Sequence, residues 1–258
     1  MTRRVRPRAR ALFLLLFVLS SAPAALAQER SADRILDEVA ATAEQLADAA
    51  FLLTGRLIDA DGTEIALELE VQVVPDANVA SAYVLQPDAL ADNIIVLDGE
   101  AVYNYTFLTH QVTVYDADDP DALGGLIGAG EDGRIETTFD LERLFSGYEA
   151  SVVGEADTPE GPATVVRLDN LEEGAVIASV DATIPESTSL PYRLEMRGAD
   201  GDLLAELRFE QLRTDVGLDA DEVAYLPEDA EVIDEREPDG GDGGDAGDGG
   251  DANGAAGG

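Results

Sequence analysis

The feature that most constrains the fold is one long segment with two chemically different faces. Between Thr63 and Val74, apolar residues at every second position alternate with polar ones: Ile65, Leu67, Leu69, Val71 and Val73 against Glu64, Glu68, Glu70 and Gln72. Side chains alternate between the two faces of a strand, so this pattern is typical of a half-buried antiparallel sheet. The Asp61-Gly62 turn signal before it predicts a hairpin with a preceding strand over 51–59.

Similar patterns predict a chain made almost entirely of strands. We expect further strands over 79–85, 94–97, 101–107, 111–115, 148–155, 163–169, 176–183, 191–197 and 203–213. A helix should begin after Ser31, which can cap it, and a short helix is expected over 139–145. The predicted fold class is mainly β (α+β): an unclosed antiparallel β-barrel or strongly curved half-barrel with a helical lid.

One stretch breaks the strand pattern. Between residues 116 and 133, the apolar residues Leu123, Leu126 and Ile127 lie among several glycines. This stretch is too rich in glycine for a rigid helix and too apolar for a solvated loop. We interpret it as a mobile flap, or lid, over an apolar surface.

Both ends of the chain differ from the body. Residues 1–27 combine five arginines, the apolar run Ala11 to Leu19 and the small-x-small sequence Ala25-Leu26-Ala27. This pattern predicts a secretory signal peptide, because the apolar run is far shorter than the roughly 20 residues needed to span a bilayer. Residues 237–258 consist almost only of Asp, Gly and Ala, which predicts a disordered acidic tail, with weak and non-specific cation binding as the alternative. Residues 28–236 form the expected folded domain.

Charge and composition argue against several function classes. The formal net charge is −38, and the 16 basic residues are all arginine. A nucleic-acid binder needs a basic face, and anionic headgroups repel a chain of this charge. With one His and no Cys, the chain offers almost nothing for a metal site or a nucleophile–base pair, and no carboxylate pair stands out as an acid–base dyad. We therefore expect no metal, no cofactor and no enzyme activity.

Two segments resemble a known family. The run Ile94 to Tyr105 reads as a strand, an Asp98-Gly99 turn and an aromatic strand, and is followed by Gln111-Val112. This hairpin is similar to that of the periplasmic lipoprotein carriers of the LolA family. The segment from Leu218 to Val232, with Leu226-Pro227, resembles that family's terminal element. One departure is that Val74 stands before Pro75, where the carriers have an Arg that contacts the lid.

The resemblance implies a non-catalytic function. It implies a soluble periplasmic carrier that holds the acyl chains of lipoproteins or lipids in an apolar cavity. It further implies handover between an inner-membrane release complex and an outer-membrane acceptor, and we expect a monomer. The alternative is an envelope-stress sensing or regulatory module with the same half-barrel. A hydrolase ranks last, because the chain lacks a Cys, a second His and a nucleophile elbow.

Eight residues are candidates for the ligand-binding surface, which should lie under the lid: Leu67, Leu69, Val71, Tyr103, Tyr105, Phe107, Leu207 and Phe209. The residue pattern alone favours ordinary core packing for them, whereas the resemblance implies that they line a cavity. We expect the row Leu67 to Val71 to face the aromatic row Tyr103 to Phe107 across that cavity.

Overall fold

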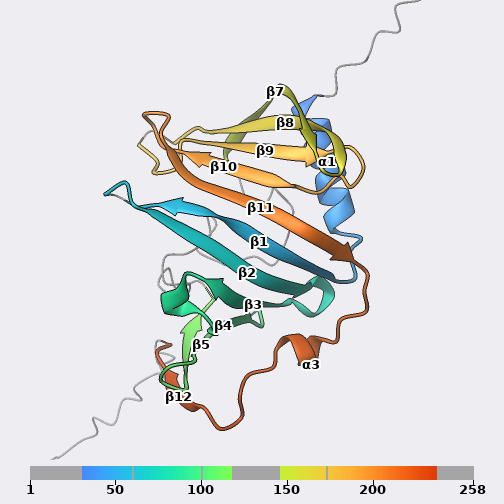
Figure 1. The fold of residues 1–258 in the computed structure, drawn as a ribbon. Helices are drawn as coiled ribbons and strands as arrows, with labels where there is room; N and C mark the ends of the chain where they lie inside the picture. Colours follow the sequence, from blue (N-terminus) through green and yellow to red (C-terminus); the bar gives the residue numbers. More distant parts are fainter. Residues whose placement is uncertain (1–30, 60, 100, 118–145, 173, 237–258) are drawn as a thin grey trace, which may run out of the picture. The chain divides into compact units, whose positions relative to one another are not determined.

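The computed structural model describes residues 31–59, 61–99, 101–117, 146–172 and 174–236 (Figure 1). The predicted signal peptide, the lid residues Leu123, Leu126 and Ile127, the helix expected over 139–145 and the acidic tail lie outside the described residues. In the described part, no helix is long and apolar enough to cross a membrane.

The described chain opens with the predicted helix, α1 (Ala32–Ala43). Ser31 caps it, since its side chain accepts a hydrogen bond from the Arg34 backbone N–H at 3.4 Å. The buried residues of α1 include Ile35, Leu36 and Val39, which recur at helical spacing and therefore form one apolar stripe.

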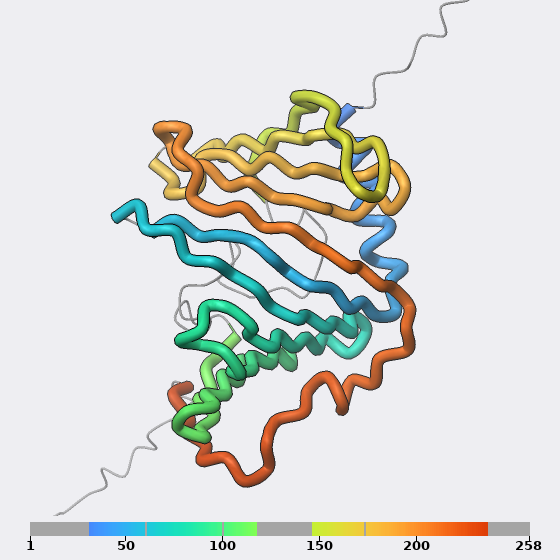
Figure 2. The backbone as a smooth tube through the Cα atoms, in the orientation of Figure 1, coloured from blue at the N-terminus to red at the C-terminus, as the bar shows by residue number. Residues whose placement is uncertain are grey.

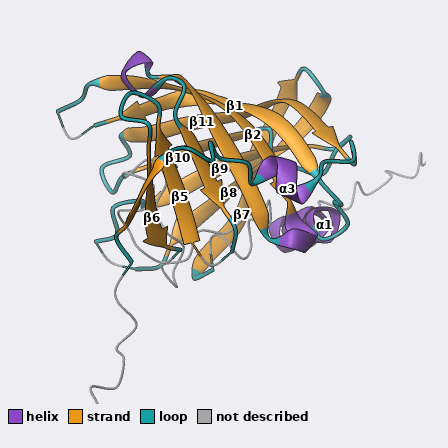
Figure 3. Ribbon diagram, turned by 90° about the horizontal axis from the view of Figure 1, so that it is seen from below, coloured by secondary structure: helices purple, strands orange, loops and turns teal. Residues whose placement is uncertain are grey.

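Twelve strands form a single sheet. In chain order they are β1 (Ala49–Ile58), β2 (Glu64–Val74), β3 (Val79–Gln86), β4 (Ile94–Leu97), β5 (Ala101–Thr106), β6 (Gln111–Asp116), β7 (Tyr148–Thr158), β8 (Gly161–Asn170), β9 (Ser179–Pro185), β10 (Arg193–Arg197), β11 (Leu203–Thr214) and β12 (Glu231–Asp234). Three single turns complete the described elements: η1 (Pro75–Ala77), η2 (Asp88–Leu90) and α3 (Ala220–Val223). Figure 3 shows how little of the described chain is helical.

The spatial order is β12-β6-β5-β4-β3-β2-β1-β11-β10-β9-β8-β7, so the sheet ends at β12 and β7 and is not closed. Neighbouring strands pair antiparallel, except that β12 pairs parallel with β6. This arrangement confirms the predicted fold class, a mainly β protein with an unclosed sheet.

Around β1 and β11, the sheet has an apolar face and a charged face. On β1 and its neighbours, Leu53 pairs with Leu69 on one side and with Phe209 on the other, and these side chains share the face on which α1 packs. We call it the helix face. The alternate residues along these strands point to the opposite face. They include Arg56 and Glu206, which pair with each other across β1 and β11.

Gly55 brings β1 and β11 unusually close at the centre of the sheet. It pairs with Leu207, and a Cβ atom at this position would lie 2.1 Å from the carbonyl oxygen of Glu206. Only glycine leaves room for this approach.

A cluster of ion pairs organises the opposite face. Glu206, whose side chain is 7% exposed, contacts Arg208 at 2.6 Å, Arg193 at 3.1 Å and Arg56 at 3.3 Å. Burial raises the pKa of Glu206, but the hydrogen bond from Arg208 and the charges of Arg193, Arg208 and Arg56 outweigh it, so the pKa lies below its ordinary value. Because its charges are paired in this way, we expect this face to be a poor surface for an apolar ligand.

Candidate ligand-binding face

The helix face carries two buried apolar clusters that meet at its centre. The first joins the start of α1 to β8, β9 and β10 through Ala32, Ile35, Leu36, Val39, Val166, Leu168, Val180, Ala182, Ile184 and Leu194. The second joins the end of α1 to β1, β2 and β3 through Ala43, Leu46, Ala49, Phe51, Leu53, Leu67, Leu69, Val73, Val84 and Leu190. Leu207 and Phe209 pack against both clusters. The result is one apolar surface that continues from β3 to β8.

Five of the eight predicted site residues lie together on this surface. Leu67 and Leu69 are each 3% exposed, while Val71, Leu207 and Phe209 are half-buried. The Phe209 ring lies 5.5 Å from that of Phe51, measured between centroids, at an interplanar angle of 48°. β2 and β11 thus place their predicted residues on either side of β1.

The predicted aromatic row lies elsewhere. Val71 pairs with Ala82, Ala82 pairs with Ile95, and Ile95 pairs with Asn104. Asn104 therefore shares the helix face, and its neighbours Tyr103 and Tyr105 point to the opposite face. The expectation that these tyrosines face Leu67 to Val71 is wrong.

Tyr103 and Tyr105 instead form a small core of their own. Tyr105 is 5% exposed and packs with Ala101, Val112 and Val114, with Tyr103 alongside. Leu226 and Ala230 from the end of the chain pack against this cluster. Phe107 lies beyond the end of β5 and is 53% exposed, so it belongs to neither apolar surface.

The C-terminal strap, which we define as residues 215–236, packs against this tyrosine cluster through Leu226 and Ala230. Figure 2 shows it leaving β11 and running past the lower strands of the view to β12. Its start is held by the buried carboxylate of Asp48, which accepts hydrogen bonds from the backbone N–H groups of Val216 at 2.7 Å, Gly217 at 2.8 Å and Leu218 at 3.2 Å.

His110 holds the far end of the strap. It lies at the surface, with its side chain 46% exposed, and it has two side-chain partners. Its Nδ1 lies 2.9 Å from the hydroxyl of Tyr105, and its Nε2 lies 3.2 Å from a carboxylate oxygen of Asp229 in the strap. The backbone N–H of Glu231 also donates to the His110 carbonyl at 3.0 Å. These contacts give His110 a structural role in attaching the strap.

Sequence reasoning also missed part of the helix face. Leu194 on β10 and Val180 and Ala182 on β9 belong to the first cluster, whereas the sequence predicts only that they lie in strands. The alternation of Leu194 and Met196 with Arg193, Glu195 and Arg197 was the available signal, since it matches that of residues 203–210 on the paired strand.

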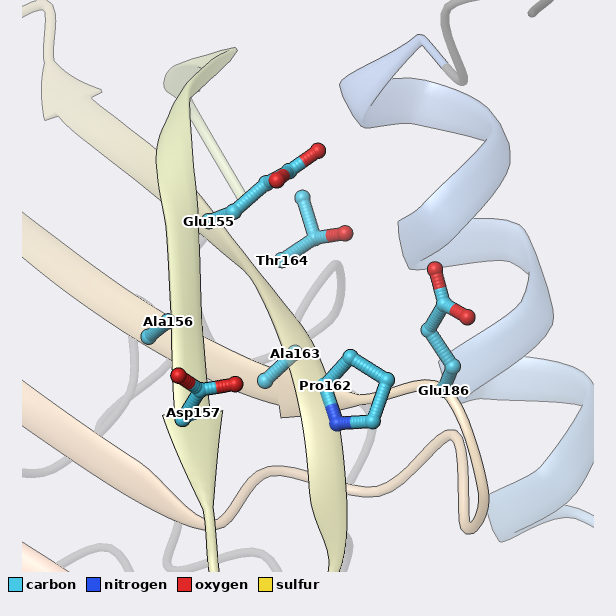
Figure 4. A pocket seen from close by; sticks show the side chains of 7 residues that line it. All are labelled: Glu155, Ala156, Asp157, Pro162, Ala163, Thr164 and Glu186. Atoms are coloured by element: carbon cyan, nitrogen blue, oxygen red, sulfur yellow. The ribbon is translucent and has the colours of Figure 1, made fainter.

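An acidic pocket lies at the β7 end of the sheet. Figure 4 shows its lining from β7, β8 and the end of β9, beside α1: Glu155, Ala156, Asp157, Pro162, Ala163, Thr164 and Glu186. Its volume is about 440 Å³. Within the described ranges, no group of three or more His, Cys, Asp or Glu side chains is placed to hold a metal ion.

Comparisons with known proteins find similarity in structure alone. No protein-family model matches the sequence. No curated protein matches it either. An uncharacterized conserved protein from Thermus thermophilus has a TM-score of 0.56 and 20% identity, over 79% of this chain and 98% of that chain.

MucB has a TM-score of 0.51 and 20% identity, over 78% of this chain, which spans 65% of the MucB chain. A LolA superfamily protein from Nitrosomonas europaea matches with a TM-score of 0.39 and 12% identity, over 76% of this chain and 98% of that one. The chain shares its fold with MucB and the Thermus protein. The solved structures that match also include LolA superfamily proteins, the family that the 94–105 hairpin resembles.

Proposed function

We propose that this protein is an exported carrier that binds the acyl chains of lipoproteins or lipids on its helix face and ferries them across the periplasm to the outer membrane. The observation that carries the proposal is the continuous apolar surface from β3 to β8, with Leu207 and Phe209 at its centre. The paired charges around Glu206 on the opposite face support the choice of the helix face.

The physical need for such a surface is large. Each methylene of an acyl chain costs about 0.8 kcal/mol when it is exposed to water, so a carrier must cover most of the chain. An unclosed sheet suits this task, because its two end strands are not hydrogen-bonded to each other and the apolar face can open to admit a long chain. The signal peptide expected over 1–27 supports export. The inner-membrane release complex and outer-membrane acceptor belong to this proposal through the LolA resemblance.

A displacement assay with two neighbouring variants tests the proposal. The protein should bind an apolar fluorescent probe, and an acylated lipopeptide should displace the probe while its deacylated form does not. Val71→Glu places a carboxylate on the half-buried part of the helix face, where it should abolish acyl binding. The matched control is Gln72→Glu, which places the same group one residue away at an exposed position on the opposite face.

The expected result is loss of binding in Val71→Glu with the circular dichroism spectrum retained, and unchanged binding in Gln72→Glu. If the wild-type protein binds neither probe nor lipopeptide, the helix face is only a core and the proposal fails. Equal losses in both variants would also refute it, because the effect would then come from added charge rather than from the helix face.

The alternative is a regulatory module that senses envelope stress by binding another protein. The fold shared with MucB supports it, and MucB has been solved in complex with MucA from Pseudomonas aeruginosa. The same assay separates the two functions, because a module that binds only protein should leave the apolar probe in solution.

A further inference from the structure

The strand β7 forms one end of the sheet, and among the described residues no strand pairs with its outer edge. It is long, running from Tyr148 to Thr158, whereas β12 at the opposite end covers only Glu231–Asp234. Every second residue of an edge strand turns its N–H and C=O groups outward, so β7 offers a row of backbone donors and acceptors to another extended chain.

Two valines at the middle of β7 are unusually exposed. Val152 is 43% exposed and Val153 is 47% exposed. The pairing with β8 shifts here, since Val152 pairs with Val166 and Gly154 pairs with Val165, which leaves Val153 as an extra residue. Such a bulge is a usual way of discouraging indiscriminate pairing at an edge, but it does not cover the two side chains.

Carboxylates surround these valines. β7 itself carries Glu149, Glu155 and Asp157, and Glu149 pairs directly with Asp169 of β8. The cation on β8 at this end, Arg167, is already bound to both carboxylate oxygens of Asp181 at 2.7 Å. The edge is therefore strongly acidic on both sides of an apolar centre.

The pocket of Figure 4 adjoins this edge on the helix face. Glu155 pairs with Thr164 and Asp157 pairs with Pro162, and all four residues line the pocket together with Glu186. Glu155 and Asp157 belong both to the pocket lining and to the edge strand, and their carboxylates favour a guanidinium or ammonium group from a strand added to β7.

We propose that β7 is a docking edge for an extended basic segment of a partner protein, which adds as a further strand with apolar residues beside Val152 and Val153 and basic residues beside Glu155 and Asp157. Strand addition supplies main-chain hydrogen bonds, and the flanking side chains supply specificity. A second copy of this chain fits poorly. Antiparallel pairing of two β7 strands about Val152 and Val153 would bring Glu149 of one copy close to Glu155 of the other, between chains of net charge −38.

The test uses a labelled ten-residue peptide of alternating Val and Arg, with binding followed by fluorescence anisotropy at 0.15 M NaCl. A matched peptide is N-methylated at two successive central residues, so that each of its edges loses a donor. The double variant Glu155→Gln/Asp157→Asn is compared with Glu228→Gln/Asp200→Asn, which removes the same charge from exposed loop positions in the strap and in the β10–β11 turn.

We expect the N-methylated peptide to bind at least about tenfold more weakly. The Glu155→Gln/Asp157→Asn variant should weaken binding roughly fivefold, and the loop variant less than twofold. The peptide should also slow hydrogen exchange of the β7 amides.

Absence of binding would overturn the proposal. So would equal binding of the two peptides, equal losses in the two variants, or exchange protection outside β7, because each would indicate non-specific ionic attraction. A wild-type dimer at low salt that Val153→Arg abolishes would make the edge a self-interface instead. The outcome is independent of the acyl-binding proposal, since the peptide carries no acyl chain.

Discussion

The close approach of β1 and β11 makes Gly55→Ala a severe substitution. The new Cβ atom would lie 2.1 Å from the Glu206 carbonyl oxygen, and 3.1 Å from both the Glu206 carbonyl carbon and the Leu207 Cα atom, whereas ordinary contact begins near 3.4 Å. All three atoms belong to the backbone, so no side-chain rotation can relieve the clash. β1 and β11 must separate by more than 1 Å, which weakens their ladder and the Arg56–Glu206 contact.

The magnitude follows from two opposing effects. Overpacking costs about 1 to 3 kcal/mol and more where the backbone must move, while replacing a strand glycine by alanine returns roughly 0.5 to 1 kcal/mol. We therefore expect a net loss of about 2 kcal/mol in the free energy of unfolding, which lowers the melting temperature by roughly 4 to 8 °C.

Thermal unfolding followed by circular dichroism measures this change, with urea titration as a second measurement. The control is Gly154→Ala on β7, where a Cβ atom would meet nothing within 4 Å, and its melting temperature should equal or slightly exceed that of the wild type. A Gly55→Ala protein as stable as the control would refute the close approach of β1 and β11.

Three further perturbations test the charges and the strap. The pKa of Glu206 is lowered in the folded protein, so its ion pairs stabilise the fold fully above the unfolded-state pKa, and this contribution is lost as the pH falls through the folded-state pKa. Glu206→Gln should cost about 2 kcal/mol in the free energy of unfolding at pH 7. The free energy of unfolding of this variant should also fall less steeply with decreasing pH. Asp48→Ala leaves three N–H groups of the strap without their acceptor, so it should cost about 1 to 3 kcal/mol in the free energy of unfolding. It should also speed hydrogen exchange of residues 216–218, and unchanged exchange would show that Asp48 does not hold the strap. NaCl between 0.1 and 1 M should raise the melting temperature, because it screens repulsion in a chain of charge −38; a flat or falling curve would mean that this repulsion is not a significant destabiliser.

Local patterns predicted the elements well. The Ser31 cap and the apolar stripe after it correctly indicated α1, and the alternation from residue 63 onward indicated β2 within one residue at its start. The strand predicted over 203–213 is β11, Leu203–Thr214. These segments have one apolar face each, so the period of their side chains is enough to assign the element and its buried face.

The face occupied by Tyr103 and Tyr105 could not be obtained in this way. Both faces of β5 carry apolar residues, since Val102 is as buried as Tyr105. The correct face depends on the registers of β3 with β4 and of β4 with β5, and the turns between these strands decide them. The cover of Tyr105 comes from Leu226 and Ala230, more than a hundred residues away, and no local pattern indicates such a contact.

The parallel pairing of β12 with β6 has a mechanical consequence. The strap joins the end of β11, in the middle of the sheet, to the strand beyond β6, and it is attached at Asp48 and again at His110. If the sheet flattened between β11 and β6, these two attachment points would move apart while the length of chain between them stayed the same. The strap therefore sets an upper limit on how flat this half of the sheet can become. Among the described residues, the half from β10 to β7 has no strap of this kind, and α1 packs on its helix face instead.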